Sequence, residues 1–117
     1  VKHEHAEDCI ILNQNHHVTE SYLGNLFLIG HGTVITPSLS SGSTPLLLRD
    51  ILIRLFRQLD FQVVETSELQ VESLFDADEV IVAGETGIYS VRGIEYKRFF
   101  DNIRKFLISK ITEISRD

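Results

Sequence analysis

Apolar and polar residues follow each other in short runs over the first third of the chain. Runs of strand length lie between turns that are rich in Gly, Asn and His, and they cover residues 8–13, 18–21, 25–29 and 33–35. Short runs separated by such turns are typical of antiparallel hairpins. Residues 36–45 are then mostly small and polar, which indicates a loop.

An apolar pattern with helical spacing begins directly after this loop. Large aliphatic side chains recur on one helical face, at Leu48, Ile51, Leu52, Leu55 and Leu59. Thr44 suits the N-cap of this helix, and Pro45 suits its first position, where a backbone N–H has no intrahelical partner in any case. We therefore expect a helix that begins near Pro45.

The rest of the chain alternates between strand and helix patterns. The sequence predicts strands over residues 61–65, 79–83 and 88–94, a short helical turn over 71–75 and a long terminal helix over 96–114. Four consecutive apolar residues follow Glu79, so we expect that strand to be buried on both faces. Hairpins first, then alternating helices and strands, predict a mixed α/β (α+β) fold in one domain over residues 1–117.

The composition excludes several classes of function. A net charge of −6 argues against nucleic-acid binding, because affinity for phosphate backbones comes from clustered Lys and Arg. No run approaches the ~20 apolar residues that cross a membrane. The only cysteine, Cys9, cannot form an intrachain disulfide, which favours the reducing cytoplasm, and we expect it to be a buried, unreactive thiol. No metal site is expected, because no complete ligand set forms around His3, His5, His16 and His17.

Five short runs along the chain occur in an order and spacing that resemble one family. They are Val18-Thr19-Glu20, Asn25-Leu26-Phe27, Thr36-Pro37, Pro45 to Asp50 and Ala77-Asp78-Glu79-Val80. Together they resemble the C-terminal half of class IV (fold-type IV) pyridoxal-phosphate enzymes, which include branched-chain aminotransferases, D-amino-acid aminotransferases and 4-amino-4-deoxychorismate lyase. The resemblance implies the D-amino-acid-aminotransferase-like fold, pyridoxal 5'-phosphate as cofactor, a small amino substrate and a homodimer.

Glu20 is the first residue to which the resemblance assigns a role. In the family, a glutamate five residues before the Asn of the Asn-Leu-Phe run contacts the pyridine nitrogen of the cofactor, and Glu20 and Asn25 keep this spacing. The chemistry needs a carboxylate there, because it stabilises a protonated ring that draws electrons from the substrate. Taken alone, Glu20 would be interpreted as a solvent-facing strand residue.

The start of the predicted helix is the second candidate site. Free N–H groups and the positive end of the helix dipole can hold a phosphate there. The resemblance assigns the cofactor phosphate to the backbone N–H groups of Leu47 and Leu48. The family sequence at this point is Pro-Gly-Ile-Thr-Arg, whereas this chain has Leu46 in place of the glycine and Leu48 in place of the threonine. An ordinary core helix that binds no ligand is the alternative.

Two further positions match family residues. Thr86 lies in the loop Gly84-Glu85-Thr86-Gly87, which corresponds to a family loop that reaches the phosphate and the substrate carboxylate. The alternative is a plain glycine turn between two strands. Arg49 matches a family arginine, and we expect it to pair with a carboxylate or to bind loop carbonyls.

The family's Schiff-base lysine has no counterpart in this chain. It lies a few tens of residues before the glutamate that Glu20 matches, and only nineteen residues precede Glu20 here. We therefore expect no catalytic residue in the chain, no N-terminal domain, and no activity of the chain by itself.

Two other hypotheses remain open. The first is a degenerate module of the same fold that has lost its chemistry and serves as a binding or scaffold protein. Leu46 and Leu48 favour this hypothesis, because they replace residues that approach the phosphate. The second is an unrelated α/β domain that binds a small molecule, and no residue pattern favours it.

Overall fold

A five-stranded mixed sheet forms the centre of the fold. The computed structural model describes residues 8–116, with side chains described as far as Ile111. The strands lie in the order β5-β4-β3-β6-β7, with bounds β3 (Asn25–Gly30), β4 (Thr33–Pro37), β5 (Gln62–Thr66), β6 (Glu79–Gly84) and β7 (Gly87–Ser90). Neighbouring strands are antiparallel except β4 and β5, which run parallel.

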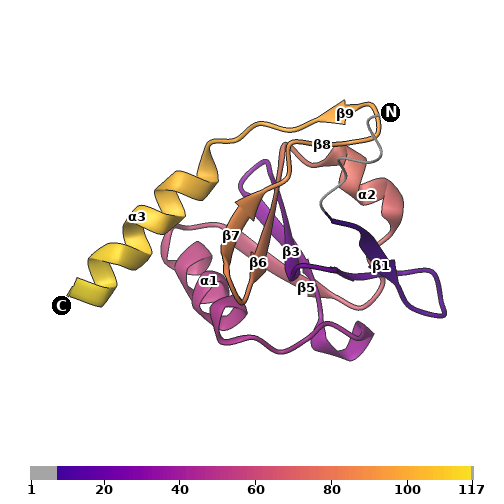
Figure 1. Ribbon diagram of the computed structural model, residues 1–117, viewed down its shortest axis with the longest axis horizontal. Coiled ribbons are helices and arrows are strands. Elements are labelled where there is room, and N and C mark those ends of the chain that lie inside the picture. The colour runs from indigo at the N-terminus through magenta and orange to yellow at the C-terminus, as the bar shows by residue number, and fades with distance from the viewer. Residues whose placement is uncertain (1–7, 117) are drawn as a thin grey trace.

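Shorter elements surround this sheet. Two further pairs of strands form small sheets of their own, β1 (Ile10–Leu12) with β2 (Val18–Ser21) and β8 (Gly93–Ile94) with β9 (Lys97–Arg98). The helices are α1 (Leu47–Gln58), α2 (Val71–Asp76) and α3 (Ile103–Arg116), and a 3-10 turn, η2, covers Leu39–Ser41. Figure 1 shows α1 and α3 to the left of the five central strands and α2 to their right. Within residues 8–116, no helix has the length and apolar character that a membrane span requires. The predicted mixed α/β fold, with hairpins before alternating helices and strands, is confirmed.

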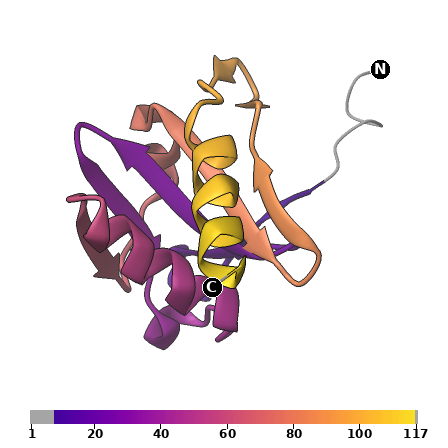
Figure 2. The same ribbon diagram turned by 90° about the vertical axis from the view of Figure 1, so that its left-hand side faces the viewer.

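The two central strands, β3 and β6, are buried on both faces, because successive side chains of a strand point to opposite sides. Phe27 and Ile81 belong to an apolar cluster that α1 and α3 cover. Their neighbours Leu26 and Val82 belong to a second cluster, which β2 and α2 cover. Figure 2 shows α1 and α3 side by side over the first of these faces. The expectation that residues 79–83 are buried on both faces is therefore confirmed for Val80 to Ala83.

The start of α1 and the ends of three strands lie at the same end of the sheet. Helix α1 connects β4 to its parallel neighbour β5, so its start lies at the carboxyl ends of both strands. The end of β6 lies at the same edge, because Ala83 pairs with Asn25 at the start of β3. Ligands of α/β proteins commonly bind outside the carboxyl ends of strands. We refer to this side as the carboxyl edge.

The structure corrects the predicted start of α1. The sequence predicts Thr44 as N-cap, but the N-cap is Leu46, and it makes no side-chain capping bond. Thr44 cannot cap the helix because its N–H and its hydroxyl both bind the Glu20 carboxylate. The sequence also predicts residues 36 and 37 in the loop, but β4 continues to Pro37 because both residues pair with β5.

The end of the chain differs most from the sequence prediction. The strand predicted over 88–94 is divided between β7 and β8, and the helix predicted from residue 96 begins only at Ile103. Glu95 has a positive φ of 53°, which turns the chain into the β8–β9 hairpin instead. The carboxylate of Glu79 accepts the N–H groups of Asn102 and Ile103 over 2.8 and 2.9 Å, which fixes the start of α3.

The prediction of a buried thiol is also wrong. Cys9 is exposed, and it precedes β1, which begins at Ile10. Strand β1 pairs only with β2, outside the main sheet, and Ile11 and Leu12 are exposed as well. An apolar run at the periphery of the fold is therefore not sufficient evidence of burial.

Gly24 and Gly84 bring two backbone segments into close approach at the carboxyl edge. A Cβ atom on Gly84 would lie 2.1 Å from the carbonyl oxygen of Leu23, and a Cβ atom on Gly24 would lie 2.3 Å from that of Ala83. Both obstacles are backbone atoms of paired segments, so they cannot move aside without distorting the sheet. Both positions therefore require glycine, because there is no room for the Cβ atom of any other residue.

We expect Gly84→Ala to lower the free energy of unfolding by about 3 kcal/mol, because the added methyl group overpacks the sheet against a backbone carbonyl. Gly30→Ala is the matched control, since the nearest atom to its Cβ, on Asp78, lies at 3.4 Å. Urea unfolding followed by circular dichroism measures both variants. Equal unfolding midpoints for the two variants would contradict this account of Gly84.

Candidate functional site

Glu20 and Thr44 connect β2 to the segment that leads into α1. The N–H of Thr44 donates to Oε1 of Glu20 over 2.8 Å, and the Thr44 hydroxyl donates to Oε2 over 3.2 Å. Glu20 is half-buried, and both of its carboxylate oxygens are held. Sequence reasoning missed Thr44 as a partner of Glu20, because capping rules consider only neighbours within a few residues.

Further side chains hold the loop before α1 against the hairpins. The buried Asn25 donates from Nδ2 to the carbonyl oxygen of Thr44 over 3.0 Å. The hydroxyl of Ser43 donates to the carbonyl oxygen of Thr19. Backbone N–H and C=O groups in loops need such partners, because no helix or sheet supplies their hydrogen bonds. The loop over residues 38–46 is thereby fixed to β2 and β3 at the carboxyl edge.

The first turn of α1 presents unpaired backbone donors. The N–H of Arg49 bonds the carbonyl oxygen of Leu46 over 3.1 Å, whereas no group among the described residues accepts the N–H of Leu47 or Leu48. Free N–H groups at a helix start can hold an anion. Leu46 has extended backbone angles, φ −113° and ψ 145°, which any residue type adopts. A leucine in place of a glycine at this position therefore introduces no backbone strain.

An open hollow of about 510 Å³ lies between the start of α1 and the turn that joins β6 to β7. One wall comprises Leu46, Leu47, Leu48 and Ile51, and the other comprises residues 84–87. Leu47, Leu48 and Thr86, to which the family resemblance assigns contacts with one cofactor, therefore line one cavity. Glu20 is not part of this lining, and Thr44 connects it to the start of the helix.

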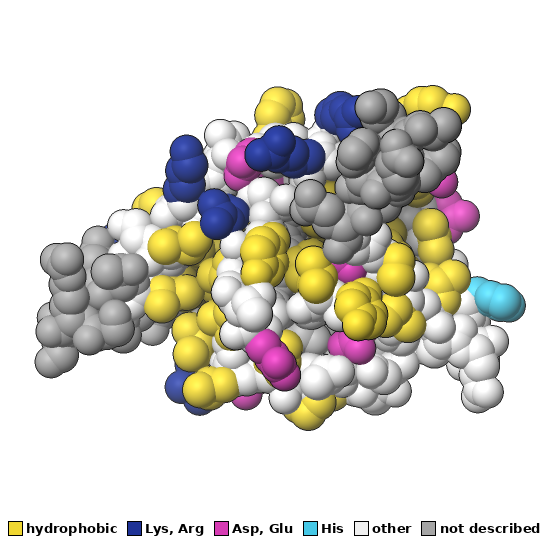
Figure 3. All heavy atoms as spheres, in the orientation of Figure 1, with side chains coloured by type: hydrophobic (Ala, Val, Ile, Leu, Met, Phe, Trp, Pro, Cys, Tyr) yellow, Lys and Arg dark blue, Asp and Glu magenta, His cyan; other side chains and the backbone are white. Residues whose placement is uncertain are grey.

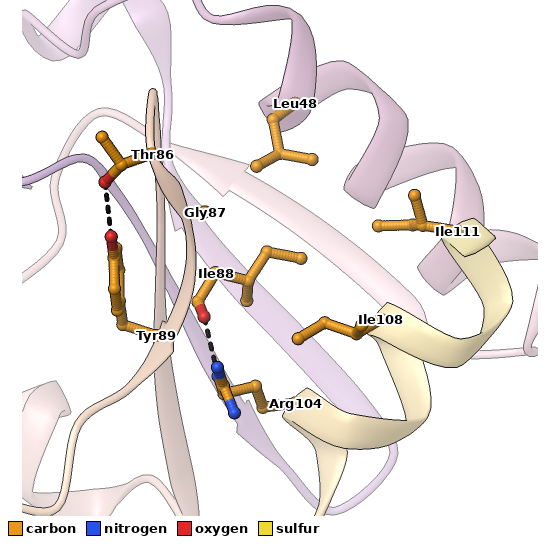
Figure 4. A pocket seen from close by; sticks show the side chains of 8 residues that line it. All are labelled: Leu48, Thr86, Gly87, Ile88, Tyr89, Arg104, Ile108 and Ile111. Carbon is orange, nitrogen blue, oxygen red and sulfur yellow. Dashed lines mark hydrogen bonds between the residues drawn. The ribbon is translucent and has the colours of Figure 1, made fainter. Parts of the chain in front are cut away.

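A second hollow of about 390 Å³ adjoins the first between α1, β7 and α3. Its walls are mainly apolar, and Figure 4 shows Leu48, Ile88, Ile108 and Ile111 pointing toward one another. Arg104 donates from Nε to the carbonyl oxygen of Ile88 over 2.7 Å. Sequence reasoning missed Arg104, which lies in a helix pattern without any motif. These contacts attach the start of α3 to β7.

Thr86 and Tyr89 interact at the turn between β6 and β7. Their hydroxyl groups form a hydrogen bond with each other, as Figure 4 shows. Thr86 is exposed and lines the first hollow, and its hydroxyl is turned toward Tyr89 (Figure 4). The pair gives this turn a polar group opposite the start of α1.

Arg49 is a buried structural residue, as the sequence predicts. Its side chain is only 3% exposed, and Nη2 donates to the carbonyl oxygen of Pro37 over 3.1 Å and to Oε1 of Glu65 over 2.9 Å. These bonds connect α1 to the ends of β4 and β5. Of the two predicted roles of Arg49, pairing with a carboxylate is confirmed, while the carbonyl that it binds belongs to the last residue of β4 and not to a loop.

We expect Arg49→Met to lower the free energy of unfolding by about 2–3 kcal/mol, because it leaves a buried carbonyl and a half-exposed carboxylate without their donor. Arg54→Met is the control, since Arg54 is exposed on the same helix. Thermal unfolding of both variants measures the difference. A similar loss in the two variants would show that the bonds of Arg49 do not matter.

None of the histidines that the structure describes, His16, His17 and His31, lines either hollow. His16 and His17 lie in the turn between β1 and β2, and His3 and His5 lie outside the described residues. Within the part of the chain that the structure describes, no three His, Cys, Asp or Glu side chains gather where they could hold a metal ion.

Comparison with known proteins identifies relatives of this arrangement. The family described as amino-transferase class IV matches residues 1–94. The branched-chain-amino-acid aminotransferase of Escherichia coli K12 is 36% identical over 93 residues, which cover 76% of this chain and 30% of that protein. A candidate 4-amino-4-deoxychorismate lyase from Legionella pneumophila superposes with a TM-score of 0.83 at 32% identity. The matched region covers 92% of this chain and 41% of the Legionella chain.

The same fold occurs with the cofactor in a more distant structure. An aminotransferase from Brucella abortus, solved bound to pyridoxal phosphate, superposes with a TM-score of 0.84 at 21% identity. The matched region covers 94% of this chain and 40% of the Brucella chain. The chain thus spans less than half the length of each of these relatives. A family match over most of the chain and the agreement of fold lead to one conclusion. The chain belongs to the class IV aminotransferase family.

Proposed function

We propose that the chain is the C-terminal, cofactor-binding domain of a pyridoxal-phosphate-dependent enzyme. The complete protein would be an aminotransferase, or a lyase similar to 4-amino-4-deoxychorismate lyase, and would act on an amino acid or another small substrate with an amino group. The observation that carries the proposal is the Glu20 carboxylate, which is held beside the segment that leads to the free N–H groups of α1. The share of each relative that the chain covers, from 30% to 41%, supports a role as one part of a longer protein.

The residues present fit this cofactor. Glu20 offers an acceptor for the N–H of the pyridine ring, and the free N–H groups of Leu47 and Leu48 offer donors for the phosphate. Thr86, on the opposite wall of the hollow, is proposed as a further contact of the cofactor. When bound, pyridoxal phosphate draws electrons from the α-carbon of an amino substrate. The chain's own residues would bind the group at both ends and keep its ring in one orientation.

The lysine that attaches the cofactor is proposed to lie in the longer protein, before this chain. Lys97, Lys105 and Lys110 all follow α1 in the sequence, whereas the family's Schiff-base lysine precedes the glutamate that Glu20 matches. The chain by itself is therefore proposed to be inactive. A cytoplasmic location agrees with its single, exposed cysteine, Cys9, which no intrachain disulfide can protect.

A homodimer is part of the proposal, since the family builds its active site between two subunits. Several large apolar side chains remain exposed, and Leu47, at 76% exposure, lies on the wall of the hollow itself. Figure 3 shows hydrophobic side chains gathered over the middle of one face. Exposed apolar groups of this kind are expected to be covered by further protein.

A degenerate, non-catalytic module remains the second candidate function, and Leu48 favours it because no hydroxyl is available at that position. Two observations favour retained binding. Leu46 is unstrained, and the leucines leave the hollow of about 510 Å³ open instead of filling it.

Incubation of the complete protein with pyridoxal phosphate separates the two candidates. The enzyme is expected to develop a visible absorbance band that disappears when the upstream lysine is replaced. Lys105→Ala is the control, because Lys105 is exposed on α3 and should leave the band unchanged. A well-folded protein without any band would support the degenerate module.

A further inference from the structure

We propose that Thr44 is a positioning residue that fixes the Glu20 carboxylate relative to the start of α1, an inference that rests on the proposed function. Thr44 is assigned no role by the family resemblance. Its importance follows from three hydrogen bonds, which engage its N–H, its hydroxyl and its carbonyl oxygen.

The first two bonds fix the plane of the carboxylate. A glutamate side chain has several rotatable bonds, and ordering it on ligand binding would cost part of the binding free energy. Because the N–H of Thr44 holds Oε1 and its hydroxyl holds Oε2, Glu20 is already ordered. Each carboxylate oxygen can accept more than one hydrogen bond, so a further donor can still bind. The acceptor is thus prepared before any ligand arrives.

The third bond fixes Thr44 itself. Asn25 is 1% exposed and lies at the first position of β3, where it pairs with Ala83 at the carboxyl edge. Its Nδ2 donates to the carbonyl oxygen of Thr44 over 3.0 Å. Its Oδ1 is buried without a partner among the described groups. Among those groups, the side-chain hydrogen bond that Asn25 makes is therefore the one that holds Thr44.

These contacts connect the two ends of the proposed site through one short segment. Thr44 lies three residues before Leu47, where the free N–H groups of α1 begin. The carboxylate for the ring and the donors for the phosphate are therefore fixed to the same stretch of backbone. A rigid spacing between them favours one ligand length and one ring orientation.

The test uses the affinity of the complete, cofactor-free protein for pyridoxal phosphate. Thr44→Val removes the bond to Oε2 but keeps the N–H, and it is expected to weaken binding about tenfold, the size of one hydrogen bond to a charged group. Thr44→Ser restores the hydroxyl and should bind within about twofold of wild type. Thr33→Val, on β4 at the opposite edge of the sheet, is the matched control and should not change affinity. Thr44 is exposed, so the substitution is not expected to prevent folding.

A double-mutant cycle distinguishes positioning from a general structural effect. In a protein that already carries Glu20→Ala, Thr44→Val has no carboxylate to release and should change affinity less than about twofold. The same tenfold loss in both backgrounds would overturn the positioning role.

The outcomes also separate this inference from the proposed function. If Glu20→Ala weakens binding and Thr44→Val binds as wild type, only the role of Thr44 is refuted. If the complete wild-type protein folds and does not bind pyridoxal phosphate, both the proposed function and this inference are refuted.

Discussion

Replacement of Glu20 by alanine in the complete protein is expected to reduce turnover by at least about a hundredfold, comparable to the loss of one preorganised electrostatic contact in an active site. Among the described residues, Glu20 is the carboxylate that Thr44 holds next to the start of α1. Folding should be nearly intact, because the hydrogen bonds of the Glu20 side chain are exposed and contribute about 1 kcal/mol. Steady-state kcat and thermal unfolding, measured on the same samples, separate the two effects.

Glu68→Ala is a matched control for this experiment. Glu68 is an exposed glutamate before α2, and its side chain forms no hydrogen bond with another described residue. Its kcat should equal that of wild type. A Glu20→Ala enzyme that retains more than a third of wild-type turnover would show that the carboxylate does not act on the cofactor.

Phe56→Ala is expected to lower the free energy of unfolding by about 3–5 kcal/mol, the largest stability effect that we expect in this chain. Phe56 is fully buried between the sheet and α1. Its ring lies 5.9 Å from that of Phe27 and 5.4 Å from that of Phe61, measured between ring centroids. Removal of the ring leaves a cavity that these neighbours can fill only partly, since they are fixed on β3 and at the start of β5.

Phe100→Ala tests the same chemical change at an exposed position. Phe100 is 67% exposed, so its replacement should alter stability by less than about 0.5 kcal/mol. Urea unfolding of both variants gives the comparison. A loss below 1 kcal/mol for Phe56→Ala would contradict the close packing of Phe56 in the cluster that α1 and α3 cover.

The centre of the fold could be predicted because its signals are local and strong. Four consecutive apolar residues in β6 and the helical spacing from Leu48 to Leu59 each indicate one conformation, and β6 and α1 lie close to the predicted ranges. The order of elements then restricts the fold class. No comparable local signal indicates that β4 and β5 are parallel neighbours, because that pairing depends on where α1 packs.

The C-terminal region could not be predicted because a tertiary contact overrides its local pattern. Phe99 lies at helical spacing from Ile103, which favours one continuous helix. In the structure its N–H bonds the carbonyl oxygen of Arg92 over 3.0 Å, and its ring packs against the cluster on the α2 side of the sheet. Apolar side chains at helical spacing can therefore belong to a hairpin when a nearby core accepts them.

The candidate site was accessible from the sequence only in part. Glu20, Leu47, Leu48 and Thr86 follow from motif positions, and their role in binding stays a prediction. The contacts of Thr44 and Asn25 could not be derived, because they join residues 24 and 19 positions apart. Spatial proximity of this kind depends on the completed sheet.

The position of β3 in the sheet has a consequence for synthesis of the protein. Strand β3 pairs with β4 on one side and with β6 on the other, and β6 ends at Gly84. A nascent chain that has emerged from the ribosome only as far as α2 therefore lacks the strand that completes both apolar faces of β3. Until β6 has emerged as well, Leu26 and Phe27 lack the neighbouring side chains Val82 and Ile81, and exposed apolar surface of this kind favours aggregation of a nascent chain.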